Sequence, residues 1–457
     1  MANTHAPDQF KTWSEIAGYL GISVREAQYR ERNEGLPVRR MGGKKPRVWA
    51  LRAELDAWLN AETARAAPPL YPAPDDQAPA SVAAPPPTEE SGASKAQWGR
   101  RAVLGAAGLA AMAVGAKLIF GTRKPRVERA VLTGSLLTTL DGLGSPIWTH
   151  RFAGELEEPS AADLAWRLQI VDLEGDGSPG VLAVCSRITQ ATPLRTGIDE
   201  LFYFGSDGHI KWTLPLRPDL LDFDGKQFEP TWICSRVVAV PSGKQQTLWV
   251  GVRHGWRWPG CVMRVDAGGA ASIQFANSGF VDLLCRVTRP DGEFVAVAGE
   301  NNAFDRSFAA VLGTNDPPSC SPSGGAARCH FANGPSGTPR DYMLFPTTEM
   351  VAVMDAPYGH VAVLTQTNDG GFVVWVSASG DNLAALLYEF SAVAEPRSVM
   401  PSGSCPAVHR RLKAEGKLSH TWAACPELQK ALTIRHWRRT NGWQDERVPW
   451  RAATDRG

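Results

Sequence analysis

The sequence lacks a large net charge, and it lacks any recognisable catalytic signature. Its 48 Lys and Arg residues stand against 47 Asp and Glu, which gives a formal net charge of +1. This balance excludes a globally basic nucleic-acid coat and an acidic, solvating tail. No serine nucleophile elbow, HExxH motif, P-loop or dinucleotide glycine motif is present. The sequence therefore names no nucleophile and no acid–base pair, and whether the protein is an enzyme stays open.

Cysteine is absent from the first 184 residues, although eight cysteines follow. Their even number and their confinement to one region favour a disulfide-permissive compartment. No C-x-x-C pair exists, which argues against zinc, and buried free cysteines remain an alternative. Cys320 and Cys329 bracket a loop rich in Ser, Pro and Gly, so they are the best candidates for a disulfide bond.

The chain does have length and apolar content. It contains 457 residues, of which 43% are hydrophobic, with 44 Gly, 34 Pro and 16 Trp. This length corresponds to about three domains, and the apolar content excludes wholesale disorder. The many Gly, Pro and Trp residues favour a turn-rich β protein over a helical bundle.

Two consecutive stretches do not have the pattern of a folded domain. Residues 61–99 contain eight prolines and no apolar periodicity, which predicts a linker. Residues 102–120 are apolar apart from Lys117, and nineteen such residues are long enough to cross a bilayer as a helix. A buried helix is the alternative, but no amphipathic stripe or partner helix flanks this stretch. We therefore expect a transmembrane helix at residues 100–122.

Basic residues flank the apolar stretch on both sides and leave its orientation contested. Three precede it and four follow it, so the positive-inside rule slightly favours a cytoplasmic C-terminus. The cysteine distribution and the N-terminal segment favour the opposite orientation. We therefore expect a single-pass protein of the inner (cytoplasmic) membrane with a cytoplasmic N-terminus and a periplasmic or otherwise extracytoplasmic C-terminal domain.

Residues 12–59 have the pattern of two short helices, a hairpin and a closing helix. Ser14 and Ser23 are placed to cap the two helices, and a Gly-Gly turn joins the two strands of the hairpin. Residues 25–52 carry nine basic and three acidic side chains, so the local charge is 9 − 3 = +6. This combination predicts a helix-turn-helix with a basic wing that binds DNA. The alternative is a solvated basic face on a protein-interaction module.

The same segment contains I-A-x-x-L-G-I-S-V-R, then E-x-x-x-G-L-P-V-R-R, then R-V-W-A. This pattern resembles the winged helix-turn-helix of MerR-type regulators and excisionase-like proteins. The coiled-coil helix that usually follows a MerR wing is missing, which leaves dimerisation open. By this resemblance, the residues expected to contact double-stranded DNA are Arg25, Gln28, Tyr29, Arg32, Arg39, Arg40, Lys44, Lys45 and Arg47.

Residues 127–457 carry short, turn-bounded strands and a weak internal repeat. Each copy is an apolar residue with a glycine four positions later and a large apolar residue eight positions later. Copies begin at Leu140, Phe204 and Val265, and a partial fourth copy begins at Val376. Each copy predicts two strands joined by a glycine turn, and the spacing favours the blades of a β-propeller. A β-sandwich is the alternative.

One loop in this region has the pattern of a cation site. Asp172-Leu-Glu174-Gly-Asp176-Gly resembles the D-x-D-x-D-G loops of FG-GAP/VCBS propellers. Oxygen ligands at alternate positions with glycine at the sixth position suit Ca²⁺, which makes Asp172, Glu174 and Asp176 candidate ligands. A turn without metal is the alternative, and no other cofactor is expected.

Together these features predict a multidomain fold class. We expect a small α+β winged helix-turn-helix domain at 1–64, a Pro/Ala-rich linker at 65–99, one transmembrane helix at 100–122 and a large all-β domain, a β-propeller, at 123–457. The layout is similar to that of CadC/ToxR-type membrane-bound regulators. The predicted function is a membrane-anchored, DNA-binding transcriptional regulator whose extracytoplasmic propeller senses a ligand or a partner protein. A homodimer is one state that this function would allow. The alternative is a membrane-anchored ligand-binding or catalytic propeller whose N-terminal module binds protein.

Overall fold

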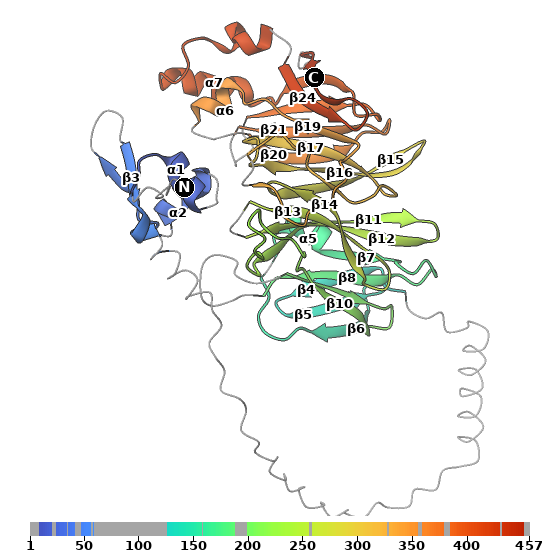
Figure 1. Cartoon of the computed structure of the whole chain (residues 1–457). Coiled ribbons are helices and arrows are strands. Elements are labelled where there is room, and N and C mark those ends of the chain that lie inside the picture. The colour runs from blue at the N-terminus through green and yellow to red at the C-terminus, as the bar shows by residue number, and fades with distance from the viewer. Residues whose placement is uncertain are drawn as a thin grey trace, which may run out of the picture. The chain divides into compact units, whose positions relative to one another are not determined.

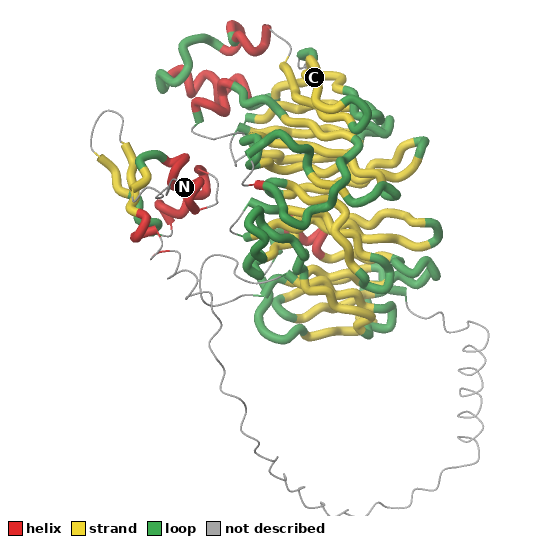
Figure 2. The backbone as a smooth tube through the Cα atoms, in the orientation of Figure 1, coloured by secondary structure: helices red, strands yellow, loops and turns green. Residues whose placement is uncertain are grey.

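The computed structural model describes most of the chain outside residues 59–125. The described residues are 9–20, 24–33, 35–41, 47–55, 58, 126–157, 159–187, 199–255, 258–326, 329–354, 359–378, 384–429 and 432–451. The predicted linker at 65–99 and the predicted transmembrane helix at 100–122 lie outside them. Strands dominate the C-terminal part of the described chain (Figure 2).

An N-terminal unit consists of two helices and a small antiparallel sheet (Figure 1). Ile16 and Leu20 lie one helical turn apart and are both buried, and they pack with Ala27, Val48 and Ala50 in a core of their own. The sheet has the strand order β1-β3-β2. The elements are β1 (Gln9–Phe10), α1 (Trp13–Leu20), α2 (Val24–Asn33), β2 (Arg39–Met41) and β3 (Arg47–Leu51).

Five further sheets follow in the described part of residues 126–451. The first contains β4 (Arg129–Thr133), β5 (Leu136–Leu140) and β6 (Pro146–Arg151). The second contains β7 (Leu168–Val171), β8 (Gly180–Cys185), β9 (Glu200–Phe204) and β10 (Ile210–Pro215). The third contains β11 (Trp232–Ser242), β12 (Gln245–His254), β13 (Gly260–Val265), β14 (Ala271–Asn277) and β18 (Ser319–Cys320). Neighbouring strands in all three are antiparallel, except that β18 pairs with β14 in parallel.

The fourth and fifth sheets complete the series. The fourth contains β15 (Val281–Arg289), β16 (Gly292–Asn301), β17 (Arg306–Gly313), β19 (Asp341–Leu344), β24 (Leu432–Arg438) and β25 (Gly442–Val448). The fifth contains β20 (His360–Gln366), β21 (Phe372–Ser377), β22 (Ala385–Phe390) and β23 (Pro396–Pro401). Both are antiparallel throughout.

Consecutive sheets face each other across separate hydrophobic cores (Figure 1). Side chains alternate between the two faces of a strand. In β12, Leu248 and Val250 pack in the core shared with the second sheet, whereas Trp249 packs in the core shared with the fourth. The third, fourth and fifth sheets each begin with a strand that lies next to the first strand of a neighbouring sheet. Strand β15 of the fourth sheet adjoins both β11 of the third and β20 of the fifth. This serial arrangement is propeller-like, which confirms the predicted all-β, propeller-like C-terminal region.

The first three copies of the sequence repeat correspond to the hairpins β5–β6, β9–β10 and β13–β14. The tryptophan of one hairpin lies against the glycine turn of the next. Its indole N–H donates to a carbonyl of that turn, at 3.2 Å for Trp148 and 3.0 Å for Trp212. A Cβ at Gly208 would lie 2.8 Å from the Trp148 ring, and one at Gly269 would lie 2.7 Å from the Trp212 ring. Both glycines have positive φ, so the turn conformation and the close tryptophan each require glycine.

The fourth sheet gains its two outer strands from the C-terminus of the chain. The hairpin β24–β25 pairs with β19, with Asp341 opposite Arg438 in the register. The chain then returns to the fifth sheet, where Val399 and Trp450 form a parallel bridge. The partial fourth repeat at Val376 coincides with the end of β21, and the residues that follow it, 379–383, lie outside the described chain.

Helices are short and sit at the ends of strands. In the C-terminal region, helix α5 (Ala161–Arg167) is capped by Ser160 and leads into β7. A helical lobe, which we define as residues 348–354 and 404–429, packs around a small core that contains Met350, Val351, Val408 and Leu412. Its elements are α6 (Glu349–Val353), α7 (Cys405–Ala414) and the 3₁₀ helices η2 (Trp422–Ala424) and η3 (Pro426–Gln429).

The predicted fold class with a transmembrane helix was wrong. The described residues are mainly strands, and none of their helices is long and apolar enough to cross a membrane. The longest, α2 and α7, have 10 residues each, whereas about 20 are needed to span a bilayer. The same finding corrects the predicted single-pass inner-membrane location with a periplasmic C-terminal domain. The domain boundaries at 64, 99 and 122 stay predictions.

Candidate functional site

A surface cleft on the fourth sheet is the candidate functional site, and we call it the arginine cleft. Its volume is about 520 Å³. Clefts that bind ligands usually have volumes of roughly 300–1,000 Å³. The cleft opens between the turn before β17, the end of β19 and the C-terminal hairpin. Its lining residues are Phe304, Arg306, Leu344, Pro346, Thr347, Thr433, Arg435 and Asp445.

The alternation of side chains along β24 places Arg435 in the cleft. Ile434 and His436 are fully buried on one face of the strand, so Thr433 and Arg435 are exposed on the other. The antiparallel register of the hairpin then sets Asp445 of β25 opposite Arg435. The cleft is therefore a consequence of strand pairing between segments that are far apart in the sequence.

Both arginines of the cleft contact uncharged groups, so their positive charge can still attract an anion. Nη1 of Arg306 donates a hydrogen bond to the carbonyl of Phe345 at 3.2 Å. The guanidinium of Arg435 lies 4.6 Å from the ring centroid of Trp443 and 5.8 Å from that of Phe304. Within the described residues, neither arginine forms an ion pair. An anionic group that enters the cleft would meet two guanidinium groups next to aromatic rings.

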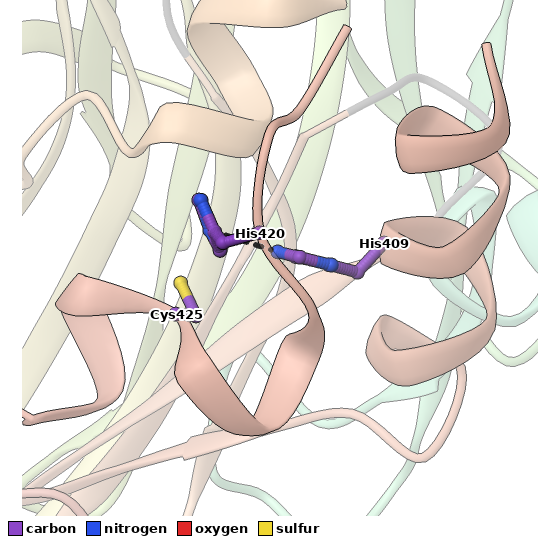
Figure 3. A group of neighbouring side chains, drawn as sticks. All are labelled: His409, His420 and Cys425. Atoms are coloured by element: carbon purple, nitrogen blue, oxygen red, sulfur yellow. Dashed lines mark hydrogen bonds between the residues drawn. The ribbon is translucent and has the colours of Figure 1, made fainter. Parts of the chain in front are cut away.

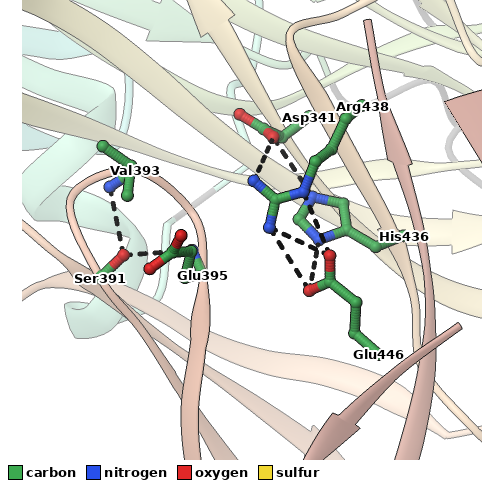
Figure 4. Close-up of polar contacts among 7 residues, drawn as sticks. All are labelled: Asp341, Ser391, Val393, Glu395, His436, Arg438 and Glu446. Atoms are coloured by element: carbon green, nitrogen blue, oxygen red, sulfur yellow. Dashed lines mark hydrogen bonds and ion pairs between the residues drawn. The ribbon is translucent and has the colours of Figure 1, made fainter. Parts of the chain in front are cut away.

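The opposite face of the same hairpin carries a charged network (Figure 4). Nδ1 of the buried His436 lies 3.0 Å from the Glu446 carboxylate, and its Nε2 lies 3.2 Å from the Asp341 carboxylate. The His436 ring therefore bridges two carboxylates from neighbouring strands. Arg438 donates to Glu446 at 3.0 and 3.1 Å. These charges satisfy one another, so this face of the hairpin is structural.

The residues predicted to contact DNA lie in the N-terminal unit. Helix α2 carries Arg25, Gln28, Tyr29 and Arg32, strand β2 carries Arg39 and Arg40, and strand β3 begins with Arg47. Lys44 and Lys45 lie outside the described residues.

Several basic side chains of this unit already have acidic partners. Arg40 donates two hydrogen bonds of 3.0 Å to the Glu31 carboxylate, which raises the pKa of Arg40. Arg39 forms an ion pair with Glu54. Arg30, which the sequence pattern places on the second helix, is only 2% exposed. The positive charge counted from the sequence is therefore partly neutralised or buried, and it does not form an open basic surface at these residues.

The predicted calcium loop gives each of its carboxylates a separate partner. Asp172 accepts three hydrogen bonds of 2.8–3.3 Å from backbone N–H groups that follow it, so it closes its own turn. Glu174 pairs with Lys211 at 3.2 Å, and Asp176 accepts a backbone N–H two residues further on. These contacts account for the loop without a metal, and calcium at Asp172, Glu174 and Asp176 stays a prediction.

The two cysteines predicted to pair lie near each other in sequence but are not joined. Cys320 ends β18, where burial raises the pKa of its thiol to about 12. Cys329 is buried in the long loop before β19. The structure contains no disulfide bond between them.

No protein-family model matches the chain, and no curated protein matches it. Among solved structures, the chain is similar to a calcium-binding protein, regucalcin, from Agrobacterium tumefaciens str. C58, with 14% identity and a TM-score of 0.29 over 60% of this chain and 74% of that one. It is also similar to BamB from Moraxella catarrhalis (10% identity, TM-score 0.31, 59% and 60% covered) and to BBS1N in complex with ARL6DN (10%, 0.31, 70% and 74%). Scores this low carry no functional argument.

The predicted MerR- or excisionase-type winged helix-turn-helix in a CadC/ToxR-type layout was wrong, and so was the DNA-binding transcriptional regulator built on it. No family model of that kind matches. The physical reason is that Arg30 is buried, whereas Arg39 and Arg40 form ion pairs with glutamates. These contacts correct the prediction of double-stranded DNA as a partner, and the short helices of the described residues correct the prediction of a membrane. Homodimer formation stays a prediction.

The cleft arginines were not among the predicted site residues. A local signal exists for one of them: residues 432–435, L-T-I-R, alternate between apolar and polar, which places Arg435 on the polar face of a strand. No local pattern connects Arg435 with Arg306, because they meet only through the pairing of β17, β19 and β24.

Proposed function

We propose that this protein is a binding module that captures an acidic, extended segment of a partner protein in the arginine cleft. The observation that carries the proposal is the pair Arg306 and Arg435, which line one cleft and, among the described residues, lack ion-pair partners. Two of the residues that line the cleft are cationic and one, Asp445, is anionic, so the cleft carries an excess of positive charge. A bound anion would balance this excess.

The remaining lining residues fit a peptide segment. A carboxylate can accept two parallel N–H bonds from a guanidinium, and such charge-assisted bonds are about twice as strong as neutral ones. Trp443 and Phe304 offer apolar rings beside Arg435, against which a flanking aromatic or aliphatic side chain can pack. Asp445 adds an acceptor for a backbone N–H or a lysine of the same segment.

The exposure of the cleft favours a chain segment over a small metabolite. Thr347, Thr433, Arg435 and Asp445 are all exposed to solvent. Sites for small molecules usually bury most of the ligand surface within mainly apolar walls. An open, charged cleft with some apolar floor instead suits a segment that lies across it and continues in both directions.

Fluorescence anisotropy with defined peptides tests this proposal. The probe is a labelled hexapeptide of alternating Glu and Tyr, and its matched control alternates Gln and Tyr. We expect the full chain to bind the Glu peptide at least about 10-fold more tightly, and Arg435→Gln to remove most of that preference, since one hydrogen bond to a charged group contributes about 1.5–3 kcal/mol. Arg447→Gln is the matched control, because Arg447 is an exposed arginine of β25 that does not line the cleft.

Two outcomes would contradict the proposal. One is equal affinity for the Glu and Gln peptides. The other is an affinity for the Glu peptide that Arg435→Gln and Arg447→Gln reduce to the same extent, since this would reflect general charge and not the cleft.

A further inference from the structure

Three potential metal ligands meet in the helical lobe (Figure 3). His409, His420 and Cys425 each offer one ligand atom, and these atoms all lie within 4.8 Å of one another. Among the described residues, no other group of three His, Cys, Asp or Glu side chains meets this condition. None of the three residues lines the arginine cleft, so the group requires its own explanation.

The fold brings the three side chains from one short stretch of chain. His409 lies on α7, His420 follows in the connection, and Cys425 comes directly after η2. His409 is only 1% exposed and Cys425 only 3%, so both ligand groups are withdrawn from solvent. A buried imidazole and a buried thiol that point at the same place are costly unless they gain a partner there.

The distance between the two histidines fits a shared cation. Nε2 of His409 and Nε2 of His420 are 3.2 Å apart. Two nitrogens that bind one tetrahedral zinc ion at about 2.0–2.1 Å would be about 3.3 Å apart. The spacing of the two nitrogens therefore suits one shared ion.

A hydrogen bond between the two rings satisfies them poorly. Two neutral imidazoles can form one such bond, in which one Nε2 donates and the other accepts. Nδ1 of His409 is buried and has no hydrogen-bond partner among the described residues. The buried His409 ring therefore has a polar contact at Nε2 but none at Nδ1 among the described residues, whereas a cation would bind both Nε2 atoms and Sγ at once.

Glu349 contacts the group from a separate element, although it is not one of the three side chains whose ligand atoms all lie within 4.8 Å of one another. Its carboxylate lies 3.4 Å from Nε2 of His420, the same nitrogen that faces His409. Glu349 is the first residue of α6, and its backbone N–H donates to the Glu427 carboxylate at 2.7 Å, which fixes the start of that helix. The four side chains thus join α6 to the segment that contains α7 and η2.

We propose that His409, His420, Cys425 and Glu349 form a structural zinc site that holds the helical lobe together. Imidazole and thiolate groups are the ligands that Zn²⁺ prefers, whereas Ca²⁺ and Mg²⁺ take oxygen ligands. Four protein ligands leave no open position, which is typical of structural zinc. The lobe has only a small apolar core, so a metal that crosslinks its two halves would contribute to its stability.

The zinc content of the full chain, prepared without a polyhistidine tag, tests the proposal. After incubation with Zn²⁺ and removal of excess metal, we expect about one equivalent of zinc per chain by atomic emission, as a site with four protein ligands would bind. Cys425→Ser and His409→Gln should lose it. Cys405→Ser is the matched control, because Cys405 is a second buried cysteine of the lobe that does not belong to the group. The Cys405→Ser variant should keep its zinc.

Cobalt provides an independent readout of the ligands. Co²⁺ bound in place of zinc should give the intense visible absorption of a tetrahedral complex together with a thiolate charge-transfer band, and only the latter depends on Cys425. If the variants fail to fold, the wild-type chain alone still decides. A chelator should then lower its melting temperature by several degrees, on the order of 5 °C, as expected when a bound ligand is removed.

The proposal is overturned by a wild-type chain that retains no zinc. It is equally overturned if Cys425→Ser binds as much zinc as the wild type, or if cobalt gives no thiolate band. These results do not bear on the arginine cleft, whose peptide test uses different residues.

Discussion

The arginines of the N-terminal unit and those of the fourth sheet are both counted as positive charge in the sequence, but the structure uses them differently. Arg40 donates two hydrogen bonds to Glu31, and Arg39 also pairs with a glutamate. Arg306 and Arg435 line a cleft and, within the described residues, form no ion pair. The N-terminal unit has the higher density of basic residues, but the fourth sheet has the cations whose charge is available to a partner.

This difference teaches that a local excess of charge does not by itself identify a binding surface. The N-terminal excess of +6 was the main reason to expect DNA, but Glu31 within the same segment and Glu54 just beyond it pair with two of its arginines. The fourth sheet also contains paired arginines, such as Arg438 with Glu446 and Arg340 with Asp316. Paired arginines should therefore contribute to stability, and unpaired ones should contribute to binding.

The buried network around Glu446 should show the largest effect on stability. Glu446→Ala removes the carboxylate that contacts both His436 and Arg438. We expect a loss of about 3 kcal/mol in the free energy of unfolding, since breaking a buried ion pair from one side costs about 3–5 kcal/mol. Urea denaturation measures it, with the exposed neighbour Gln444→Ala as control. A loss no larger than that of the control would mean that the network does not stabilise the sheet.

Asp316 should show the next largest effect, and this effect should depend on pH. Hydrogen bonds from Arg340, and the charge of Arg439, lower the pKa of the Asp316 carboxyl. A lowered pKa in the folded state means that the stabilisation is present above the unfolded pKa and is lost as the pH falls through the folded one. Asp316→Asn should therefore cost about 2 kcal/mol at neutral pH, and the difference from wild type should shrink below about pH 4.

The pH series carries its own control. Asp219→Asn changes an exposed aspartate and should leave the unfolding curve within about 0.5 kcal/mol of wild type at every pH. If the loss in free energy of unfolding caused by Asp316→Asn stayed constant down to pH 2, the ionised Asp316 carboxylate would not be what its arginine partners stabilise.

The exposed pair Arg40–Glu31 should contribute less. Arg40 keeps 50% of its side chain exposed, so solvent screens the interaction. A double-mutant cycle of Arg40→Gln with Glu31→Gln should give a coupling below about 1 kcal/mol that weakens with salt. Hydrogen exchange of peptides from residues 24–41 reports it locally. A coupling as large as that expected in the Glu446 network would remove the distinction between exposed and buried pairs.

The cleft arginines should matter least for stability. Arg306→Gln and Arg435→Gln should each change the free energy of unfolding by no more than about 0.5 kcal/mol, as is usual for surface positions that form no ion pair. Thermal unfolding of the two variants checks this. A loss above about 2 kcal/mol in either variant would indicate a structural role and would weaken the case for the cleft as a binding site.

Part of the fold could be predicted because its determinants are local. The repeats at Leu140, Phe204 and Val265 encode a glycine turn and a large residue at fixed spacing, and each became a hairpin of a sheet. The pairing of Trp148 with the turn at Gly208 could not be predicted, because it joins two hairpins that are far apart in sequence.

The candidate sites depend on such long-range pairing, and this is why the sequence did not reveal them. The cleft needs Arg306 beside Arg435, and in the zinc group the contact of Glu349 with His420 joins two distant segments. The absence of C-x-x-C argued against zinc, but a site that takes one cysteine and two histidines does not contain that motif. The acidic partners of Arg39 and Arg40 are likewise a property of the folded unit.

A double-mutant cycle between the protein and its peptide tests the central claim most directly. Arg435→Gln in the protein is combined with Glu→Gln at one central position of the Glu–Tyr hexapeptide, and the four affinities give the coupling between the two groups. If the cleft binds acidic segments through Arg435, the coupling should be about 1–3 kcal/mol for at least one position of the peptide. A coupling near zero at every glutamate would show that Arg435 does not contact the acidic side chains, and the proposed function would then be wrong.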